Sequence, residues 1–545
     1  MNKMNSPMKH ESTASMFPVA TNDDMNLNGV SIDRPNPESS VFPMTPHSST
    51  SSHNAEQLKN RNNADNLMPE QLTDVGQAKR LAALYSGQLR YSGATHWISF
   101  DGVRWTENGP AARRIVHELT EQQLAQAQKM VALATNSLLA AQRQDSKAAT
   151  EQATLDKQRA NEYLRFARRY QNSARISATL SEAQSYLEVP MECLDGDPFL
   201  LNTPAGTVDL RSGVMRPHNP EDYCTKLTGC SPNDAGREMF FEFLERVTCG
   251  DTQLQAYLQQ IAGMSAIGAV YKECLIIAYG GGGNGKSTLF NLLAYVLGDY
   301  AGSLSAEILT SNCRKNKSPE LAELRGRRFV IAAELEEGMR LDSAIIKNLC
   351  STDQINAEPK YKKPFHFSPT HTVVLYTNHL PRISTADNGT WDRMIVIPFE
   401  ARFRGQQGEV LNYAKHLYEH AGGAVLQWII DGAKKHIESG YQIGMPDRVR
   451  AVIDEYRSDN NWLKPFLDDR CTKDPKYRQP SGELYAAYRA YCDTTGDDKR
   501  STADFRQAMM DSGFNCRRTK TGSIYSGLTL KPSEASEADD LITIA

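Results

Sequence analysis

One short string constrains this chain more than any other feature of its sequence. GGGGNGKST runs from Gly280 to Thr288 and fits the pattern G-x-x-x-x-G-K-[ST] at Gly280, Gly285, Lys286 and Ser287. The apolar run CLIIAY precedes it, and KSTLFNLLAYVL follows with apolar residues at helical spacing. The sequence therefore predicts a buried strand, a glycine-rich loop and a helix in succession, which is the setting of a phosphate-binding loop.

Each residue type in this loop has a task in binding a nucleoside triphosphate. Glycines let backbone N–H groups point at phosphate oxygens without a side-chain clash, and the helix N-terminus favours anions. Lys286 would reach the outer phosphates, and the Ser287 hydroxyl would ligate magnesium. The alternative is a flexible turn with a chance GKS. We expect ATP and Mg²⁺ as cofactors, with the nucleotide held by Gly280, Gly281, Gly282, Gly283, Asn284, Gly285, Lys286, Ser287 and Thr288.

Short apolar strands alternate with helical patterns between about residues 270 and 400, the strands being CLIIAY, FVIAA, TVVLYT and MIVIPF. Such alternation predicts an α/β sheet with parallel strands. Residues 409–458 have a helical pattern. Residues 462–531 combine helical patterns with a final hairpin, which indicates a winged-helix-like domain.

The N-terminal part of the chain is more varied. Its first 75 or so residues are rich in Ser, Asn, Pro and Thr and lack apolar periodicity, so we expect disorder. THWISFDGVRW predicts a hairpin, residues 111–187 have a helical pattern, and residues 198–230 read as small strands and turns. The expected divisions are a tail (1–78), a mainly helical domain with small strands (79–235), the ATPase core (236–405), a helical lid or linker (406–460), a winged-helix-like DNA-binding domain (461–532) and a tail (533–545).

Composition bears on the compartment more than on the function. The net charge of −4 decides neither for nor against nucleic acid, because a ring can grip DNA with local lysines. The sequence holds no apolar run of membrane-spanning length and no signal peptide, so we expect no membrane partner. None of the ten cysteines forms a CxxC pair, which predicts buried or incidental thiols in a reducing cytoplasm.

Acidic residues at the end of a later buried run are candidates for catalysis. RGRRFVIAAELEEG puts Glu334 where the strand should end, and Glu336 follows closely. A carboxylate there can hold the magnesium shell or polarise the attacking water. The alternative is that these residues open a helix, whose dipole favours acidic side chains. We expect Glu334 to serve catalysis and metal binding, and leave Glu336 open between the two interpretations.

Two further residues extend the candidate site. HTVVLYTNHLP places Asn378 just beyond another buried strand, where its amide could orient water against the terminal phosphate. A lone asparagine at a strand end is usually a turn former. GTWDRMIVIPF places Arg393 directly before a strand. An arginine reaching into a neighbour's nucleotide would neutralise charge in the transition state; the alternative is a surface arginine paired with Asp392.

Basic residues mark a candidate DNA contact. INAEPKYKKPFHFSP holds two β-like runs around Lys360, Tyr361, Lys362 and Lys363, which predicts a hairpin with a basic tip. Lysines there can track a phosphate backbone and a tyrosine can stack on bases, whereas a plain charged turn is the alternative. A second basic stretch, within residues 157–175, is interpreted as a solvated helix face rather than a DNA surface.

Taken in this order, the motifs resemble those of the superfamily 3 helicases, and more closely the phage and plasmid primase–helicase group with its poxvirus-type relatives. The resemblance covers about residues 90–530 and includes LNTPAGTVDLRSG with RPHNPEDYCTKLTG, which resembles the domain before the helicase. It implies a hexameric AAA+-like ring that uses ATP and magnesium to unwind DNA. The setting it implies is the replication of a phage, prophage or mobile element in a bacterial host cell.

The resemblance also assigns roles by position. Leu335 separates Glu334 from Glu336, so the second Walker B carboxylate departs from the family pattern. The remaining assignments are Lys286 and Ser287 to Walker A, Glu334 to Walker B, Lys360 and Lys362 to the DNA-contacting hairpin, Asn378 to the sensor and Arg393 to the arginine finger.

Fused members of this group carry a primase domain before the helicase. Here about 80 mostly polar residues precede the part expected to be ordered, without a zinc-ribbon cysteine set. We therefore expect that the chain does not synthesise primers, and that its partners are DNA, further copies of itself and a separate primase or other replication proteins. Two alternatives stay open: an ATPase that remodels or packages DNA without strand separation, and an origin-binding initiator that uses ATP only to switch its assembly state.

Overall fold

The computed structural model describes residues 66–93, 95–311, 313, 318–358, 364–383, 388–403, 412–497, 499–519 and 522–531. The chain divides into two units, Met1–Asp65 and Asn66–Ala545, and all the described residues belong to the second. Most of the expected N-terminal tail, the C-terminal tail and the hairpin residues Lys360, Lys362 and Lys363 lie outside the described residues.

Five parallel strands form the central sheet, which confirms the α/β prediction. They lie in the order β13–β7–β12–β9–β8. Successive side chains point to opposite faces, so Ile276 joins one apolar cluster while Leu275 and Ile277 join the other. Burial on both faces explains why these strands are almost wholly apolar. The strands are β7 (Leu275–Tyr279), β8 (Ala301–Ser305), β9 (Phe329–Ala333), β12 (Thr372–Thr377) and β13 (Met394–Pro398).

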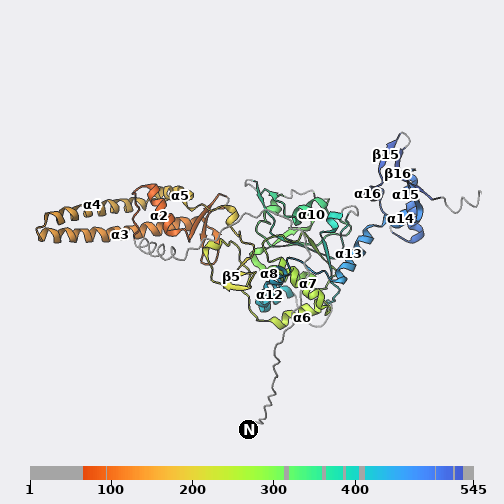
Figure 1. Cartoon of the computed structure of the whole chain (residues 1–545), viewed down its shortest axis with the longest axis horizontal. Coiled ribbons are helices and arrows are strands. Elements are labelled where there is room, and N and C mark those ends of the chain that lie inside the picture. The colour runs from red at the N-terminus through yellow and green to blue at the C-terminus, as the bar shows by residue number, and fades with distance from the viewer. Residues whose placement is uncertain are drawn as a thin grey trace, which may run out of the picture. The chain divides into compact units, whose positions relative to one another are not determined.

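Helices that share one apolar cluster cover one face of this sheet (Figure 1). The helix α12, expected within a lid or linker, packs into the core against α7 and α8. Its approach to α7 depends on glycine, because a Cβ added to Gly263 would lie 2.1 Å from the backbone nitrogen of Ala433. The helices of this face are α6 (Arg237–Val247), α7 (Thr252–Met264), α8 (Lys286–Leu297) and α12 (Tyr413–Glu438).

Shorter elements supply the cluster on the other face. Among them is an antiparallel hairpin of β10 and β11, which confirms the hairpin prediction for its two strands. The elements are η4 (Ala306–Leu309), α9 (Ser318–Ala322), α10 (Ser343–Cys350), β10 (Ile355–Ala357), β11 (Phe365–Phe367), α11 (Asn388–Trp391) and α13 (Asp447–Asn460).

The region before the core is mainly helical, as predicted. Its first helix begins at Asp74, inside the expected tail, because the Thr73 side chain accepts a hydrogen bond from the Gly76 amide and caps it. The long helices α3 and α4 lie side by side (Figure 1). The elements are α2 (Asp74–Tyr85), β1 (Leu89–Ser92), β2 (His96–Phe100), β3 (Trp105–Glu107), α3 (Gly109–Arg143), α4 (Lys147–Tyr170) and α5 (Ser173–Leu187).

Small strands then lead into the core, as predicted for residues 198–230. They form an antiparallel sheet in the order β4–β5–β6. Buried Arg328 fixes this segment to the core, since its guanidinium donates to the carbonyls of Leu200 and Ala266 at 2.8 and 2.7 Å. The elements are η1 (Met191–Cys193), β4 (Leu200–Thr203), β5 (Gly206–Asp209), β6 (Val214–Arg216), η2 (Pro220–Asp222) and, after α8, η3 (Gly298–Tyr300).

The C-terminal elements follow the order helix, strand, helix, helix, strand, strand around their own apolar cluster. Their three strands form an antiparallel sheet in the order β14–β16–β15. No helix in the described part of the chain is long and apolar enough to span a membrane. The elements are α14 (Leu463–Arg470), β14 (Cys471–Pro480), α15 (Ser481–Thr495), α16 (Thr502–Asp511), β15 (Cys516–Thr519) and β16 (Gly522–Leu530).

Candidate nucleotide-binding site

The register of the sheet brings three predicted residues to one edge. Thr377 of β12 pairs with Tyr279 of β7, and Tyr376 pairs with Ala333 of β9. The residues that follow these strand ends are the glycine loop, Asn378 and Glu334. Because all three strands are parallel, these groups leave the sheet at the same carboxyl edge, where α/β proteins bind ligands.

The Lys286 ammonium lies at the centre of this edge, and the side chain is only 6% exposed. Its Nζ donates to Asn378 Oδ1 at 2.6 Å, and the Gly280 carbonyl accepts at 2.9 Å. Asn284 Oδ1 lies 3.4 Å away. Burial lowers the pKa of Lys286, and the Glu334 carboxylate acts in the opposite direction. A desolvated cation surrounded by oxygens is well placed to exchange some of them for the oxygens of an anion.

The loop before α8 is closely packed at Gly280 and Gly285 and open at Gly281 and Gly282. A Cβ on Gly280 would lie 2.2 Å from the Phe399 carbonyl oxygen, and one on Gly285 would lie 2.7 Å from Val247 Cγ2. Gly285 also has φ +82°, which side-chain-bearing residues rarely adopt. By contrast, Cβ atoms on Gly281 or Gly282 would meet nothing within 4 Å. The backbone at Gly281 and Gly282 therefore has room for a ligand to approach it.

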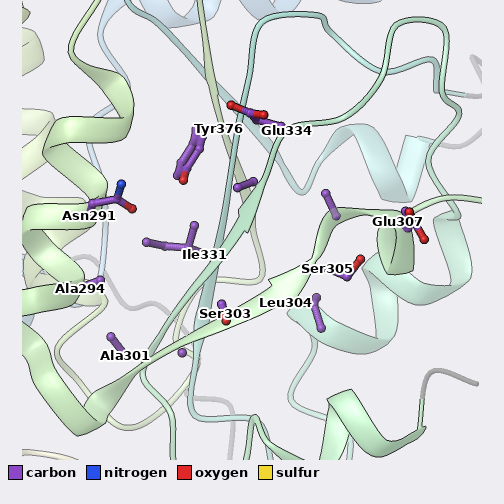
Figure 2. A pocket seen from close by; sticks show the side chains of 13 residues that line it. Asn291, Ala294, Ala301, Ser303, Leu304, Ser305, Glu307, Ile331, Glu334 and Tyr376 are labelled. Carbon is purple, nitrogen blue, oxygen red and sulfur yellow. The ribbon is translucent and has the colours of Figure 1, made fainter. Parts of the chain in front are cut away.

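Glu334 follows β9 with φ +56°, an uncommon conformation for a residue with a side chain. Its amide donates to the Tyr376 carbonyl at 3.1 Å, which fixes it beside β12. Figure 2 shows its carboxylate near Tyr376 at one end of a hollow of about 580 Å³, with Asn291 of α8 on the adjoining wall. Asn291 and Tyr376 were not singled out from the sequence, because they lie inside an ordinary helix and strand.

The other acidic residues of this loop are less closely engaged. Glu336 is exposed. Glu337 lines a second hollow together with Asn378 and Arg382. Arg382 follows Asn378 in the string NHLPR, and this spacing is the one sequence signal that could have drawn attention to it.

The fit to magnesium rests on few protein ligands. Ser287 is exposed in the first turn of α8, and Thr288 follows it half-buried. Within the described residues, no group of three or more His, Cys, Asp or Glu side chains could hold a metal ion. A magnesium ion beside a nucleotide usually keeps one or two protein oxygens as ligands, and Ser287 is the residue of the glycine loop that would supply one.

Arg393 lies at the opposite, amino-terminal edge of the sheet. Its carbonyl accepts from the Leu275 amide at 2.8 Å, directly before β13 and β7 begin. The guanidinium pairs with Glu273 rather than with Asp392, and it donates to the Gly389 carbonyl at 2.8 Å. The structure therefore does not bring Arg393 to the glycine loop of its own chain.

Two family models match separate parts of the described chain. Residues 78–249 match a family model described as "D5 N terminal like". Residues 278–393, which contain the glycine loop, Glu334 and Asn378, match a family of unknown function.

Viral proteins are among the relatives. A protein of Acanthamoeba polyphaga mimivirus whose name proposes a helicase, L207/L206, is 31% identical over 38% of this chain and 22% of its own length. One of Frog virus 3, 022R, also named for a proposed helicase, is 23% identical over 52% of this chain and 30% of its own. One of African swine fever virus, C962R, named for a proposed primase, is 27% identical over 43% and 26%. The matched region thus spans less than a third of each viral protein.

Among solved structures, the apo C-terminal region of NrS-1 is 14% identical and aligns over 55% of this chain and 76% of its own, with a TM-score of 0.35. So loose a likeness carries no argument. The sequence matches show a D5-like region at residues 78–249 and a partial likeness to viral proteins named for a proposed helicase or primase.

Proposed function

We propose that the chain is an ATP-driven DNA helicase of superfamily 3, acting in the replication of a phage, prophage or mobile element in the cytoplasm of a bacterial host. The observation that carries the proposal is the contact between Lys286 Nζ and Asn378 Oδ1 at 2.6 Å, beside Glu334. A phosphate-loop lysine, an acidic strand end and a polar residue on the strand between them form the arrangement that phosphoanhydride hydrolysis requires.

On this proposal, ATP supplies the bond whose hydrolysis drives the motor. The Lys286 ammonium would turn from the oxygens it now contacts toward the outer phosphates. Ser287 would hold Mg²⁺, and Glu334 would take the proton that the attacking water loses. Asn378, released from the lysine, would orient that water. The support for these roles is that all four groups lie at one edge of the sheet.

The position of Arg393 supports a ring. A guanidinium at the amino-terminal edge is far from the nucleotide of its own chain, but a neighbour in a head-to-tail ring can offer that edge to the next glycine loop. An arginine that enters the site from a neighbour stabilises charge in the transition state. We propose a hexamer with six shared sites on this ground and on the resemblance to superfamily 3.

Two elements are proposed to contact DNA. The hairpin of β10 and β11 carries Lys360, Lys362 and Lys363 in its connecting segment. The C-terminal order of helix, strand, helix, helix, strand and strand is that of a winged helix, and Arg517 and Arg518 are exposed on its hairpin. Forked or single-stranded DNA is the proposed substrate, with priming left to a separate protein.

A forked-duplex assay on the assembled protein tests the proposal. Wild-type protein should release the displaced strand only with ATP and Mg²⁺, and Lys286→Ala should abolish both hydrolysis and release. DNA-stimulated hydrolysis without strand release would instead favour a remodelling or packaging ATPase. Full replication activity retained by Lys286→Ala would favour an initiator that uses ATP only for assembly.

A further inference from the structure

A second candidate site lies away from the glycine loop. A cavity of about 680 Å³ opens between β2–β3, the segments around residues 191–198 and 225–226, and the chain leading into β9 and β12. Its wall includes His366 and Phe367 of β11, so it reaches the root of the basic hairpin. Of the lining residues, 325–327 lie just before β9 and 366–368 and 370 lie just before β12, which places the cavity at the amino-terminal edge of the sheet.

Two basic side chains face this cavity without an ionic partner. Among the described residues, neither the Lys226 ammonium nor the Arg325 guanidinium makes an ion pair or a hydrogen bond, although Arg325 lies over the Phe365 ring at 5.7 Å. Lys226 lies against Gly326, where a Cβ would be 3.3 Å from its Cε. Burial lowers the pKa of both groups, which are thus partly desolvated cations.

The carboxylates within the cavity are already engaged. Asp195, with φ +54°, accepts from the Thr225 amide at 2.7 Å and also from its hydroxyl. Asp299 is paired with Arg104. Glu107 and Glu192 both lie at the exposed rim, where their charges act on Arg325 together with that of Asp195.

The charge of Asp195 acts on both of these half-buried cations, and no described carboxylate forms an ion pair with either. A buried cation without full compensation is costly, and an anionic ligand would relieve that cost. The cavity is large enough for a nucleotide, and it adjoins the hairpin proposed to follow DNA.

We propose that this cavity binds a phosphate group, from a free nucleotide or from a DNA strand, through Lys226 and Arg325. It is distinct from the glycine loop, since the two lie at opposite edges of the sheet. Occupation would hold the hairpin root against the domain that carries β2 and β3.

The test uses the full-length chain with Lys286→Ala, which removes the principal phosphate contact of the glycine loop. Binding of a fluorescent ATP analogue and of labelled oligothymidylate is measured by anisotropy over a range of salt concentrations. Adding Lys226→Gln and Arg325→Gln should weaken one or both ligands at least tenfold. For the oligonucleotide, the salt dependence of log K should fall by about 0.7 for each phosphate group that the variant no longer neutralises.

A matched control removes the same two charges at exposed positions, as Lys129→Gln with Arg159→Gln. It should change affinity less than twofold. The rim variant Glu107→Gln with Glu192→Gln should tighten binding, a direction that misfolding cannot produce. Weaker binding of the oligonucleotide alone identifies DNA as the source of the phosphate, and weaker binding of the ATP analogue alone identifies a free nucleotide. Unchanged affinity for both ligands relative to the control would overturn the proposal, even if the helicase assay succeeds.

Discussion

Replacing Arg393 by alanine gives the most direct test of a shared nucleotide site. The residue lies at the edge of the sheet opposite to the glycine loop, so ATP affinity should change less than twofold. If a neighbour's Arg393 neutralises charge in the transition state, hydrolysis should fall by about 10³-fold or more. That is a loss of about 4 kcal/mol, at 1.36 kcal/mol for each factor of ten.

A structural role predicts a much smaller effect. The ion pair with Glu273 is partly exposed, with side chains 24% and 35% accessible, so its loss should cost at most about 1 kcal/mol of folding free energy. Glu273→Gln breaks the same pair and leaves the guanidinium in place. It should lower stability about as much as Arg393→Ala, measured by urea denaturation, yet keep hydrolysis within a few-fold of wild type. Equal losses of hydrolysis in the two variants would refute the finger role.

Mixed assemblies separate the two sides of the site. Arg393→Ala and Lys286→Ala subunits are each inactive alone on this proposal, but a mixed ring contains junctions where an intact loop meets an intact arginine. Steady-state ATPase over a range of mixing ratios should therefore pass through a maximum. A flat, inactive profile in rings shown to exchange subunits would mean that Arg393 acts within its own chain or not at all.

Four further outcomes are expected. Asn378→Ala should lower kcat by about ten- to a hundredfold with little change in KM, because the amide would no longer orient the attacking water in the transition state, where a hydrogen bond to a charged group contributes about 1.5–3 kcal/mol; a rise in KM alone would assign it to binding. Lys360→Ala with Lys362→Ala should weaken DNA binding in a salt-dependent way and spare basal ATPase, and a parallel loss of both would mean that the hairpin is structural. Gly285→Ala should cost about 2 kcal/mol in urea denaturation and abolish ATP binding, because φ is +82° and its Cβ would meet neighbouring side chains. Burial lowers the pKa of His371 to about 4, so the folded state binds fewer protons; up to about 3 kcal/mol of stability should be present above pH 6.5 and lost as the pH falls toward 4, and His371→Leu should flatten that dependence.

Local pattern was enough to predict the strands and the loop between them. The almost wholly apolar runs at β7, β9 and β12 are typical of strands buried in a parallel sheet, and the glycine string predicts the loop that connects β7 to α8. Since parallel strands end at one edge, the sequence also predicted that Glu334 and Asn378 would meet Lys286. The contact of 2.6 Å between Asn378 and Lys286 depends on the register of β12 and β7, which sequence spacing does not give.

Contacts between distant segments were beyond such inference. The alternative considered for Arg393 was a pair with its neighbour Asp392, yet the guanidinium pairs with Glu273 because β13 lies beside β7 and their first residues are adjacent. The cavity behind the hairpin draws its cations from Lys226 and Arg325, which lie in the strings RPHNPEDYCTKLTG and RGRRFVIAAELEEG but were not singled out in them. Whether these two cations form a candidate phosphate site depends on which nearby carboxylates are already engaged, and only the three-dimensional structure shows this.

The two edges of the sheet suggest how hydrolysis could reach DNA. β12 ends at the residue before Asn378, and its first residue follows the segment that leaves β11 and lines the phosphate cavity. A six-residue strand, about 20 Å long at 3.3 Å per residue, is buried between β7 and β9 and cannot stretch. If Asn378 moves when Lys286 turns to the nucleotide, either β12 moves as a whole or the backbone at Asn378 alone changes conformation. Movement of β12 as a whole would also move the hairpin root, which leads into the other end of the strand. A change confined to Asn378 would leave DNA affinity independent of the nucleotide.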